Sequence, residues 1–372
     1  MKENKTMFVI TNCDFQKGLG DSTLLIRRAR ALFYQKNIKS LFFCLKSIPE
    51  HIEHYEFASF SSIETINDFV ASLNESVDYV LVYGGALYFK IKKLLKARKQ
   101  YGFKLLLDVQ GCLEEMIDFT KNPIQFLKYF LKKIAFKKVL SYVDGCFVTS
   151  SKLIDYCQKY SKKKKLNYYL VRCGIDDIRS FNLWLNERNE IRNKFGISNK
   201  NVLVYSGSLH PWQRFFDILD IFSKYSLIDE DSFFIIMSKV DEKTLSTIQE
   251  KLPNNNYVII FADQNEYSKI LGACDIGFLL RDYKMTNMVA FPNKFSDYLE
   301  SRLIVSTNQA IPEIIDIMSK NQIVFFNPET DDLSKLKLMI DKKKNNLKEY
   351  NDLIIDVCKK LSYEEQVAKL DI

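Results

Sequence analysis

The chain has 372 residues, of which 47% are hydrophobic and 27% are charged. This composition is typical of a folded protein and excludes a mainly disordered chain, while only 12 glycines and 7 prolines exclude a collagen-like or low-complexity one. The length favours two domains, each with its own hydrophobic core. The formal net charge of +8 is compatible with nucleic acid, an anionic membrane or an anionic small ligand as partner.

The longest uncharged apolar stretch, residues 79–89, is far shorter than the roughly 20 residues that a membrane-spanning helix needs. The N-terminal apolar patch is too short for a secretory signal, so we expect none. The eight cysteines are scattered singly, without a C-x-x-C pair or histidines at ligand spacing. We therefore expect a cytoplasmic protein with reduced cysteines and no metal site.

In the first half of the chain, short apolar runs alternate with longer helical patterns. The predicted strands are 7–11, 41–45, 79–83, 104–108 and 145–149. The predicted helices between them are 22–35, 63–72, 89–99 and 124–142. This alternation is typical of a parallel sheet with helices on its faces.

The second half repeats the pattern. The predicted strands are 201–206, 233–237, 257–261, 276–280 and 303–306, and the predicted helices are 214–224, 242–251, 267–274 and 293–301. From about residue 331 onward we expect only helix. The predicted fold class is therefore α/β, with two tandem Rossmann-like, doubly wound domains facing a central cleft. We expect the domains to be 1–176 and 177–359, with a helix at about 360–372 packing back on the first.

Two polar segments follow predicted strands of the first domain. The first, QKGLGDS, holds Gly18 and Gly20, whose backbone can approach a ligand at a helix N-terminus, although a plain turn is equally compatible. A dinucleotide fingerprint is rejected, because Thr23 stands where a third glycine is needed. The second segment, DVQGCLEE, places Asp108 and then Glu114 at a strand's carboxyl end, which suits the rim of a cleft. Alternatively, Asp108 caps a turn and Glu114 faces water.

The second domain has two such segments. In YSGSLHPWQR, Gly207 permits close backbone contact with a ligand. In NMVAFPNKFSDYLE, Lys294 and Asp297 stand three residues apart on one helix face, where a diphosphate and a diol can both reach. Alternatively, these two residues form an ordinary surface pair worth about 0.3 kcal/mol.

Four segments in this order, DVQGCLEE, RCGIDDIRSF, VYSGSLHPWQ and GFLLRDYKMTNMVAFPNKFSDYLES, resemble glycosyltransferases of the GT-B fold. Within these, the chain is similar to the retaining family 4 group, and in particular to bacterial enzymes of capsular and surface polysaccharide assembly. The resemblance implies transfer of a sugar from a nucleotide-diphosphate sugar, UDP- or GDP-linked, to a glycan or lipid-linked acceptor. It implies no cofactor and no metal.

The resemblance also implies roles for particular residues. Catalysis falls to Arg281 and Lys294, as cations facing the diphosphate, and to Asp108 in the first domain. On the rim of the acceptor site lie Gln110 and Glu114. The implied donor-binding residues are Gly18, Gly20, Gly207, Ser208, Arg214, Asn287 and Asp297. Among these, Asp297 would accept hydrogen bonds from the ribose, and the amides of Gly207 and Ser208 would face the phosphates.

The chain departs from the family at several of these positions. Ser208 and Gln213 stand where the family often has arginine and lysine, so Arg214 and Arg281 are the nearest substitutes, with Arg281 preferred. Val289 stands where the family has a first glutamate. Gln110 stands where close relatives commonly have histidine, and a neutral amide is no general base.

The predicted helix within residues 121–142 carries an apolar stripe beside a row of lysines. Such a helix can lie on an anionic membrane, which would place the protein peripherally on the inner face of the cytoplasmic membrane. Alternatively, the stripe packs on the sheet. No nucleic-acid-binding motif accompanies the basic residues, so we expect no nucleic-acid partner. Two other functions stay open: a UDP-sugar epimerase and a catalytically degenerate GT-B partner subunit.

Overall fold

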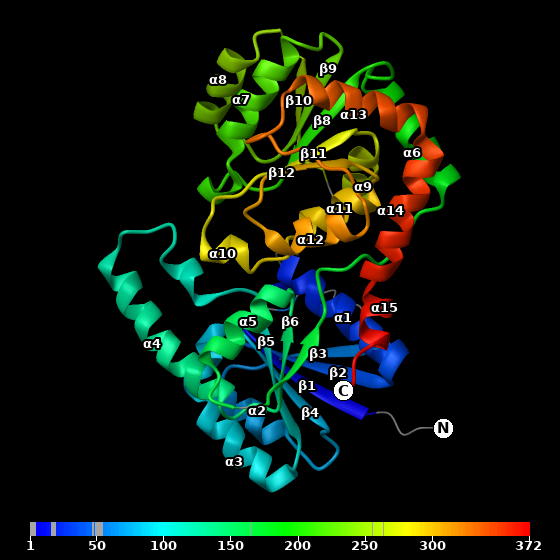
Figure 1. Cartoon of the computed structure of the whole chain (residues 1–372). Coiled ribbons are helices and arrows are strands. Elements are labelled where there is room, and N and C mark those ends of the chain that lie inside the picture. The colour runs from blue at the N-terminus through cyan, green and yellow to red at the C-terminus, as the bar shows by residue number, and fades with distance from the viewer. Residues whose placement is uncertain are drawn as a thin grey trace. The chain divides into compact units, whose positions relative to one another are not determined.

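The computed structural model describes residues 5–15, 20–46, 48, 55–163, 165–254, 256–262 and 264–372. The chain divides into two compact units, in each of which helices flank a parallel sheet (Figure 1). Unit 1 comprises residues 1–176, 289–291 and 361–372. Unit 2 comprises residues 177–288 and 292–360.

Unit 1 contains a seven-stranded sheet in the order β3-β2-β1-β4-β5-β6-β7, with every neighbouring pair parallel. Its strands are β1 Lys5–Thr11, β2 Ile38–Cys44, β3 Ala58–Ser62, β4 Tyr79–Tyr83, β5 Lys104–Val109, β6 Gly145–Val148 and β7 Asn167–Leu170. Its helices are α1 Gly20–Lys36, α2 Ile66–Ser72, η2 Gly85–Lys90, α3 Ile91–Tyr101, η3 Leu113–Met116, α4 Pro123–Leu140, α5 Ser151–Tyr160 and α15 Tyr363–Ala368. The C-terminal helix α15 packs against α1.

The central strands β1, β4, β5 and β6 of unit 1 are mostly apolar because helices cover both faces of the sheet. Successive residues of β1 alternate between two cores: Met7 and Val9 enter one, and Phe8 and Ile10 enter the other. The apolar runs that predict these strands are therefore a direct consequence of burial on both sides.

Unit 2 contains a five-stranded parallel sheet in the order β10-β9-β8-β11-β12. Its strands are β8 Asn201–Ser206, β9 Ser232–Met237, β10 Tyr257–Ile260, β11 Ile276–Leu279 and β12 Ile304–Thr307. Its helices are α6 Phe181–Lys194, η4 Pro211–Gln213, α7 Phe215–Ser226, α8 Glu242–Lys251, α9 Gln264–Gly272, α10 Met285–Met288, α11 Asn293–Glu300, α12 Pro312–Lys320, α13 Ser334–Asn345 and α14 Leu347–Leu361, the last residue of which belongs to unit 1.

The α/β fold class predicted from the sequence is confirmed, and all ten predicted strands are present. The strands β3 and β7 and the helices α5, α6, α10 and α12 were not predicted from the sequence. The helix predicted at 63–72 begins later, at Ile66, because Thr65 caps it: its hydroxyl accepts from the amide of Asp68, whose carboxylate accepts from the Thr65 amide.

Each sheet has a point where its strand order reverses, between β1 and β4 in unit 1 and between β8 and β11 in unit 2. At such a point the chain leaves neighbouring strands in opposite directions along the sheet, and ligands of open α/β sheets bind beside the carboxyl ends of these strands. The sheet topology of unit 2 therefore predicts a ligand site among the residues that follow β8 and β11.

Candidate functional site

The candidate site lies at the carboxyl-terminal edge of the unit 2 sheet, where β8 and β11 are neighbours. Ser206 ends β8, and Gly207 follows it directly. Leu279 ends β11, and Arg281 comes two residues later. Lys294, the second residue of α11, completes the set. Residues far apart in the sequence thus meet at one edge of the sheet. Three of them, Gly207, Arg281 and Lys294, were expected from the sequence to lie near one another.

Lys294 contacts two neighbouring side chains of unit 2. Its Nζ donates a hydrogen bond to Gln213 Oε1 at 2.8 Å and lies 4.5 Å from the centre of the Tyr205 ring. Burial lowers the pKa of Lys294 well below its usual value, and the charge of Arg281 lowers it further, while Asp297 opposes the shift. The surroundings therefore disfavour a charged ammonium, and a bound anion would reverse that preference.

Arg281 is the second cation of the site and is only 6% exposed. Its Nη1 donates to Leu280 O at 2.8 Å, and its backbone is fixed by Asn308, whose Nδ2 donates to Arg281 O at 2.8 Å. Burial lowers the pKa of Arg281 to about 10. The hydrogen bonds of the Arg281 and Lys294 side chains thus run to neutral oxygens. A buried and a half-buried cation in such a setting favour an anion with more than one negative charge.

Because Gly207 has no side chain, the end of the Lys294 side chain can lie against its backbone. A Cβ added at Gly207 would lie 2.6 Å from both Cε and Nζ of Lys294, and the φ of +126° is one that residues with side chains rarely adopt. The Gly207 amide donates to Met237 O at 3.0 Å, so the prediction that this amide faces a phosphate is wrong. The carbonyl of Ser208 accepts a hydrogen bond from the Tyr205 hydroxyl, which fixes the same loop.

Asp297 lies three residues after Lys294 on α11, with intermediate exposure. The Tyr267 hydroxyl donates to Asp297 Oδ2 at 3.3 Å and lies 3.2 Å from Ser206 Oγ, which in turn lies 3.2 Å from the Tyr298 hydroxyl. This network attaches α9 and α11 to the end of β8. The role of Asp297 toward a ribose stays a prediction.

Arg214, the alternative to Arg281, has carboxylate partners. Its Nε lies 2.6 Å from Asp217 Oδ2, and its Nη1 lies 2.6 Å from Glu329 Oε1. Burial alone would lower the pKa of Arg214, but its bonds to these two carboxylates outweigh burial and raise it. Because its charge is balanced within the chain, this geometry favours Arg281 as the cation for a ligand.

Asn287 was predicted to bind the donor, but the structure gives it a structural role. Its side chain is buried, and its Nδ2 donates to Asp282 O at 2.9 Å. This bond fixes the turn that leads into α10, so the amide faces the chain's own backbone.

Asp108 does not lie on a rim, and this part of the prediction is wrong. Its side chain is fully buried and forms an ion pair with Arg28 of α1, whose guanidinium lies 4.5 Å from the centre of the Phe147 ring. The reason is the alternation of β5, which turns Asp108 toward α1 and away from solvent. An ion pair in this position supports packing and offers no catalytic group.

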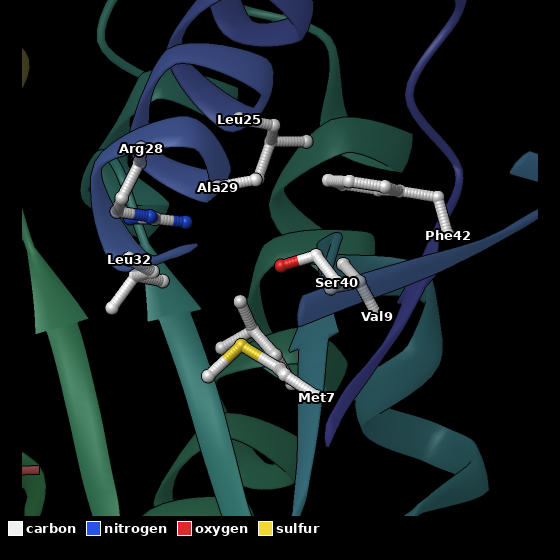
Figure 2. A pocket seen from close by; sticks show the side chains of 9 residues that line it. Met7, Val9, Leu25, Arg28, Ala29, Leu32, Ser40 and Phe42 are labelled. Carbon is white, nitrogen blue, oxygen red and sulfur yellow. The ribbon is translucent and has the colours of Figure 1, made fainter. Parts of the chain in front are cut away.

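A small cavity adjoins this ion pair (Figure 2). Its volume is about 10 Å³, which is room for one water and far too little for a sugar nucleotide. In Figure 2, the Ser40 hydroxyl and the Arg28 guanidinium both point into the space between α1 and the sheet. The lining residues are Met7, Val9, Leu25, Arg28, Ala29, Leu32, Ser40, Phe42 and Leu81.

Glu114 was predicted on the acceptor rim, yet three tyrosines hold its carboxylate. Tyr156 donates at 2.6 Å, Tyr129 at 2.9 Å and Tyr160 at 3.3 Å. Burial by itself would raise the pKa of Glu114, but the tyrosine hydrogen bonds outweigh it and lower the pKa. Glu114 thus anchors α4 and α5, and its partners lie too far along the chain for local sequence patterns to reveal them.

The remaining predicted residues of unit 1 are less constrained. The Tyr83 hydroxyl donates to Gln110 Oε1 at 3.4 Å, whereas Gln110 Nε2 is buried without a hydrogen-bond partner among the described residues. Gly20 begins α1, and Gly18 lies outside the described residues. Neither glycine's predicted donor contact is tested by these positions.

Within the described ranges, no group of three or more His, Cys, Asp and Glu side chains is placed to hold a metal ion. The chain's one Asp-x-Asp triplet, at 229–231, is structural, since Asp229 accepts from Tyr225 and Asn201 at 2.7 Å each. In the described part of the chain, no helix combines the length and the apolar character needed to cross a bilayer.

No protein-family model and no curated protein matches this sequence. Solved structures do match the fold over nearly its whole length. Anabaena HepE in complex with UDP-glucose has a TM-score of 0.66 at 11% identity, with 98% of each chain covered. A glycosyltransferase from Rickettsia africae has a TM-score of 0.64 at 14% identity, covering 98% of this chain and 96% of that one. WaaG, a glycosyltransferase involved in lipopolysaccharide biosynthesis, has a TM-score of 0.64 at 13% identity and 98% coverage of both chains. With its two parallel-sheet units, the chain has the GT-B fold.

Proposed function

We propose that the chain is a retaining, metal-independent glycosyltransferase of the hexosyltransferase type. It would move a sugar from a UDP- or GDP-linked donor to a glycan or lipid-linked acceptor. The observation that carries the proposal is the pair of cations beside the ends of β8 and β11, the buried Arg281 and the half-buried Lys294. HepE, which has the same fold, binds UDP-glucose, and this supports a sugar nucleotide as the ligand.

The cation pair suits the departing diphosphate. In sugar transfer, the bond between C1 and the diphosphate oxygen breaks while C1 bonds to the acceptor oxygen, so negative charge grows on the diphosphate. Arg281 and Lys294 would stabilise this charge, and one preorganised donor contributes about 3–4 kcal/mol in such a role. Two positive side chains at this point provide the charge that a metal ion would otherwise provide.

Retention of configuration fits the groups that the site offers. In a retaining transfer of this kind, the acceptor hydroxyl attacks from the face that the diphosphate leaves, and its proton passes to the departing diphosphate. No side-chain base is then needed, which agrees with a neutral glutamine at Gln110 and with the burial of Asp108.

The nucleoside end of the donor would lie along α11. Asp297 is about one helical turn from Lys294, so a ribose diol on Asp297 and a diphosphate on Lys294 belong to one ligand. We propose unit 1 as the acceptor side and bacterial surface polysaccharide, such as capsule, as the product. Both parts rest on the sequence resemblance.

The test is nucleotide binding by the purified full chain, followed by a transfer assay. We expect UDP or GDP to raise the thermal unfolding midpoint, since a ligand at 100 times its Kd adds about 2.7 kcal/mol of stability. The Lys294→Met variant should lose this shift. Lys269→Met is the matched control, because Lys269 lies in the same unit but is half-exposed and pairs with Glu187 at 3.6 Å. Equal shifts in all three proteins would show that the donor site is assigned wrongly.

The transfer assay separates the proposal from its two rivals. A glycosyltransferase consumes the sugar nucleotide only with an acceptor, whereas an epimerase converts it alone. A degenerate partner subunit would bind UDP or GDP at Lys294 and turn over no donor with any acceptor. Either of these results would overturn the proposed reaction and leave the nucleotide site standing.

A further inference from the structure

The helix α4 of unit 1 has two apolar faces, of which one is covered. Its covered face includes Tyr129, Phe136, Val139 and Leu140, all of them buried. The ring of Phe136 lies 5.5 Å from that of Tyr88 on η2, which shows where this face packs. The buried face alone therefore packs α4 against unit 1, and the opposite face of the helix takes no part in this packing.

The opposite face exposes large apolar side chains to solvent. We call it the α4 stripe, and its members, with their exposed fractions, are Ile124 (60%), Phe126 (44%), Leu127 (63%), Phe130 (64%), Leu131 (51%) and Ile134 (60%). The alternative in which this stripe packs on the sheet is therefore wrong. Six such side chains on one helix form a contiguous patch, and patches of this kind mark interaction sites.

The charges around the stripe identify its partner. α4 contains five lysines and no acidic residue. By helical spacing Lys128 borders the stripe on one side, Lys137 lies at its opposite margin, and Lys138 continues its line at the C-terminal end. The neighbouring helix α3 also lacks acidic residues, while Lys92, Lys93 and Lys96 on it are exposed. An apolar face bordered by lysines complements a surface that is apolar within and anionic outside.

We propose that the α4 stripe docks this protein on an anionic lipid bilayer. α4 would lie in the plane of the interface, with the stripe at the boundary of headgroups and acyl chains and with Lys128 and Lys137 at the level of the phosphates. A second copy of the chain fits less well, because it would bring two lysine-rich faces together without acidic partners. The inference needs no sugar transfer and is tested without any nucleotide.

The first test is co-sedimentation of the full chain with vesicles. We expect binding to vesicles of phosphatidylglycerol and phosphatidylcholine, and much weaker binding to phosphatidylcholine alone. Raising the salt concentration should weaken binding to the anionic vesicles, because salt screens the lysines. Failure to bind the anionic vesicles at low salt would overturn the proposal.

The second test removes the stripe. The double variant Leu127→Ser/Leu131→Ser should lose about tenfold or more in affinity for the anionic vesicles, because two inserted side chains become polar. The matched control is Leu227→Ser/Leu338→Ser in unit 2, where the two leucines are 80% and 68% exposed. It should bind as the parent does. All four leucines are exposed, so thermal unfolding should show that both variants remain folded.

A third test reports insertion directly. In Phe130→Trp, the new indole should shift its emission to shorter wavelength on anionic vesicles and be quenched by brominated lipid, while Leu338→Trp should show neither change. If the Phe130→Trp emission does not respond, the stripe does not enter the bilayer. A parent dimer that becomes monomeric in Leu127→Ser/Leu131→Ser, with no vesicle binding, would assign the stripe to a second copy instead.

Discussion

Unit 2 contains two groups of buried or half-buried cations, and the groups differ in the acceptors of their hydrogen bonds. At the amino-terminal edge of the sheet, Arg188 lies 2.5 Å and Arg192 3.4 Å from the carboxylate of Asp275, and Lys343 donates to Asp275 O at 3.2 Å. At the opposite edge, the hydrogen bonds of the Arg281 and Lys294 side chains run to a backbone carbonyl and an amide oxygen.

The difference distinguishes a structural group of charges from the proposed binding site. Besides the Asp275 carboxylate, the carbonyls of Gly272, Ala273 and Cys274 at the end of α9 accept from Arg188 and Arg192, and the negative end of a helix favours such cations. The cations of this group thus have their hydrogen-bond and ion-pair partners within the chain. The charges at the carboxyl-terminal edge are available to an anion that comes from outside.

The largest expected effect is the loss of stability when the carboxylate of the structural group is removed. Asp275→Ala leaves Arg188, Arg192 and Lys343 buried without their carboxylate, so the free energy of unfolding should fall by about 3–5 kcal/mol in urea titration. The control is Glu266→Ala, which removes a surface pair with Lys194 at 3.5 Å and should cost below about 1 kcal/mol. Equal losses in the two variants would contradict the distinction between the groups.

The next effect concerns the proposed binding pair, Arg281 and Lys294. Substitutions there should lower turnover without lowering stability. Arg281→Ala and Lys294→Met should each lower turnover by about 100-fold or more, because each removes a donor to the departing diphosphate. Their free energy of unfolding should stay the same or rise, since each removes a basic side chain whose charged form is disfavoured by burial in the folded protein. Initial rates and urea unfolding on the same preparations check this, and a variant that is unstable but fully active would contradict it.

The contrast between the two edges also shows how far the sequence can be interpreted. That Gly207, Arg281 and Lys294 lie together was predictable, because parallel strands end at one shared edge and these residues follow strands or begin a helix there. Their role in binding stays a proposal. The contact of Lys294 with Gln213 was not predictable, since it joins residues 81 positions apart through side chains alone.

Carboxylates were the weak point of the sequence analysis. Asp108 lies near the end of β5 and Glu114 follows that strand, at positions where catalytic acids often stand, but their partners are Arg28 in one case and three tyrosines in the other. Those partners determine whether a carboxylate is a reactive group or a structural one. Only the folded chain brings the carboxylates and their partners together. The strand β3 was missed for a similar local reason: its serines make it polar at the edge of the sheet.

A smaller effect sharpens the role of Gly207. Gly207→Ala should cost about 1–3 kcal/mol of stability, because it forces a strained φ, and it should also weaken nucleotide binding by displacing Lys294. The control is Gly196→Ala, at φ +66° with nothing within 4 Å of the added Cβ, which should cost about 1 kcal/mol and leave nucleotide binding unchanged. Nucleotide titration calorimetry and urea unfolding separate the two, and parental binding by Gly207→Ala would contradict the role assigned to the glycine.

The smallest expected effect is a proton that accompanies the nucleotide. In the free protein, burial holds the pKa of Lys294 well below its usual value, and a bound diphosphate would raise that pKa. Between the two pKa values, binding therefore takes up as much as one proton, and nucleotide affinity falls as the pH rises through that window. Calorimetry in buffers of different ionisation enthalpy measures this uptake, which should disappear in Lys294→Met.

Lys343 is the internal control, because burial lowers its pKa as well, to about 7. For both lysines the unfolded chain binds more protons above the lowered pKa, so the free energy of unfolding rises with pH until the ordinary lysine pKa is reached. Lys343→Met should flatten this rise from about pH 7 upward but leave the pH dependence of nucleotide binding intact. If Lys343→Met instead removes the proton uptake, the anion lies at the wrong edge of the sheet, and the distinction between the two groups of cations fails.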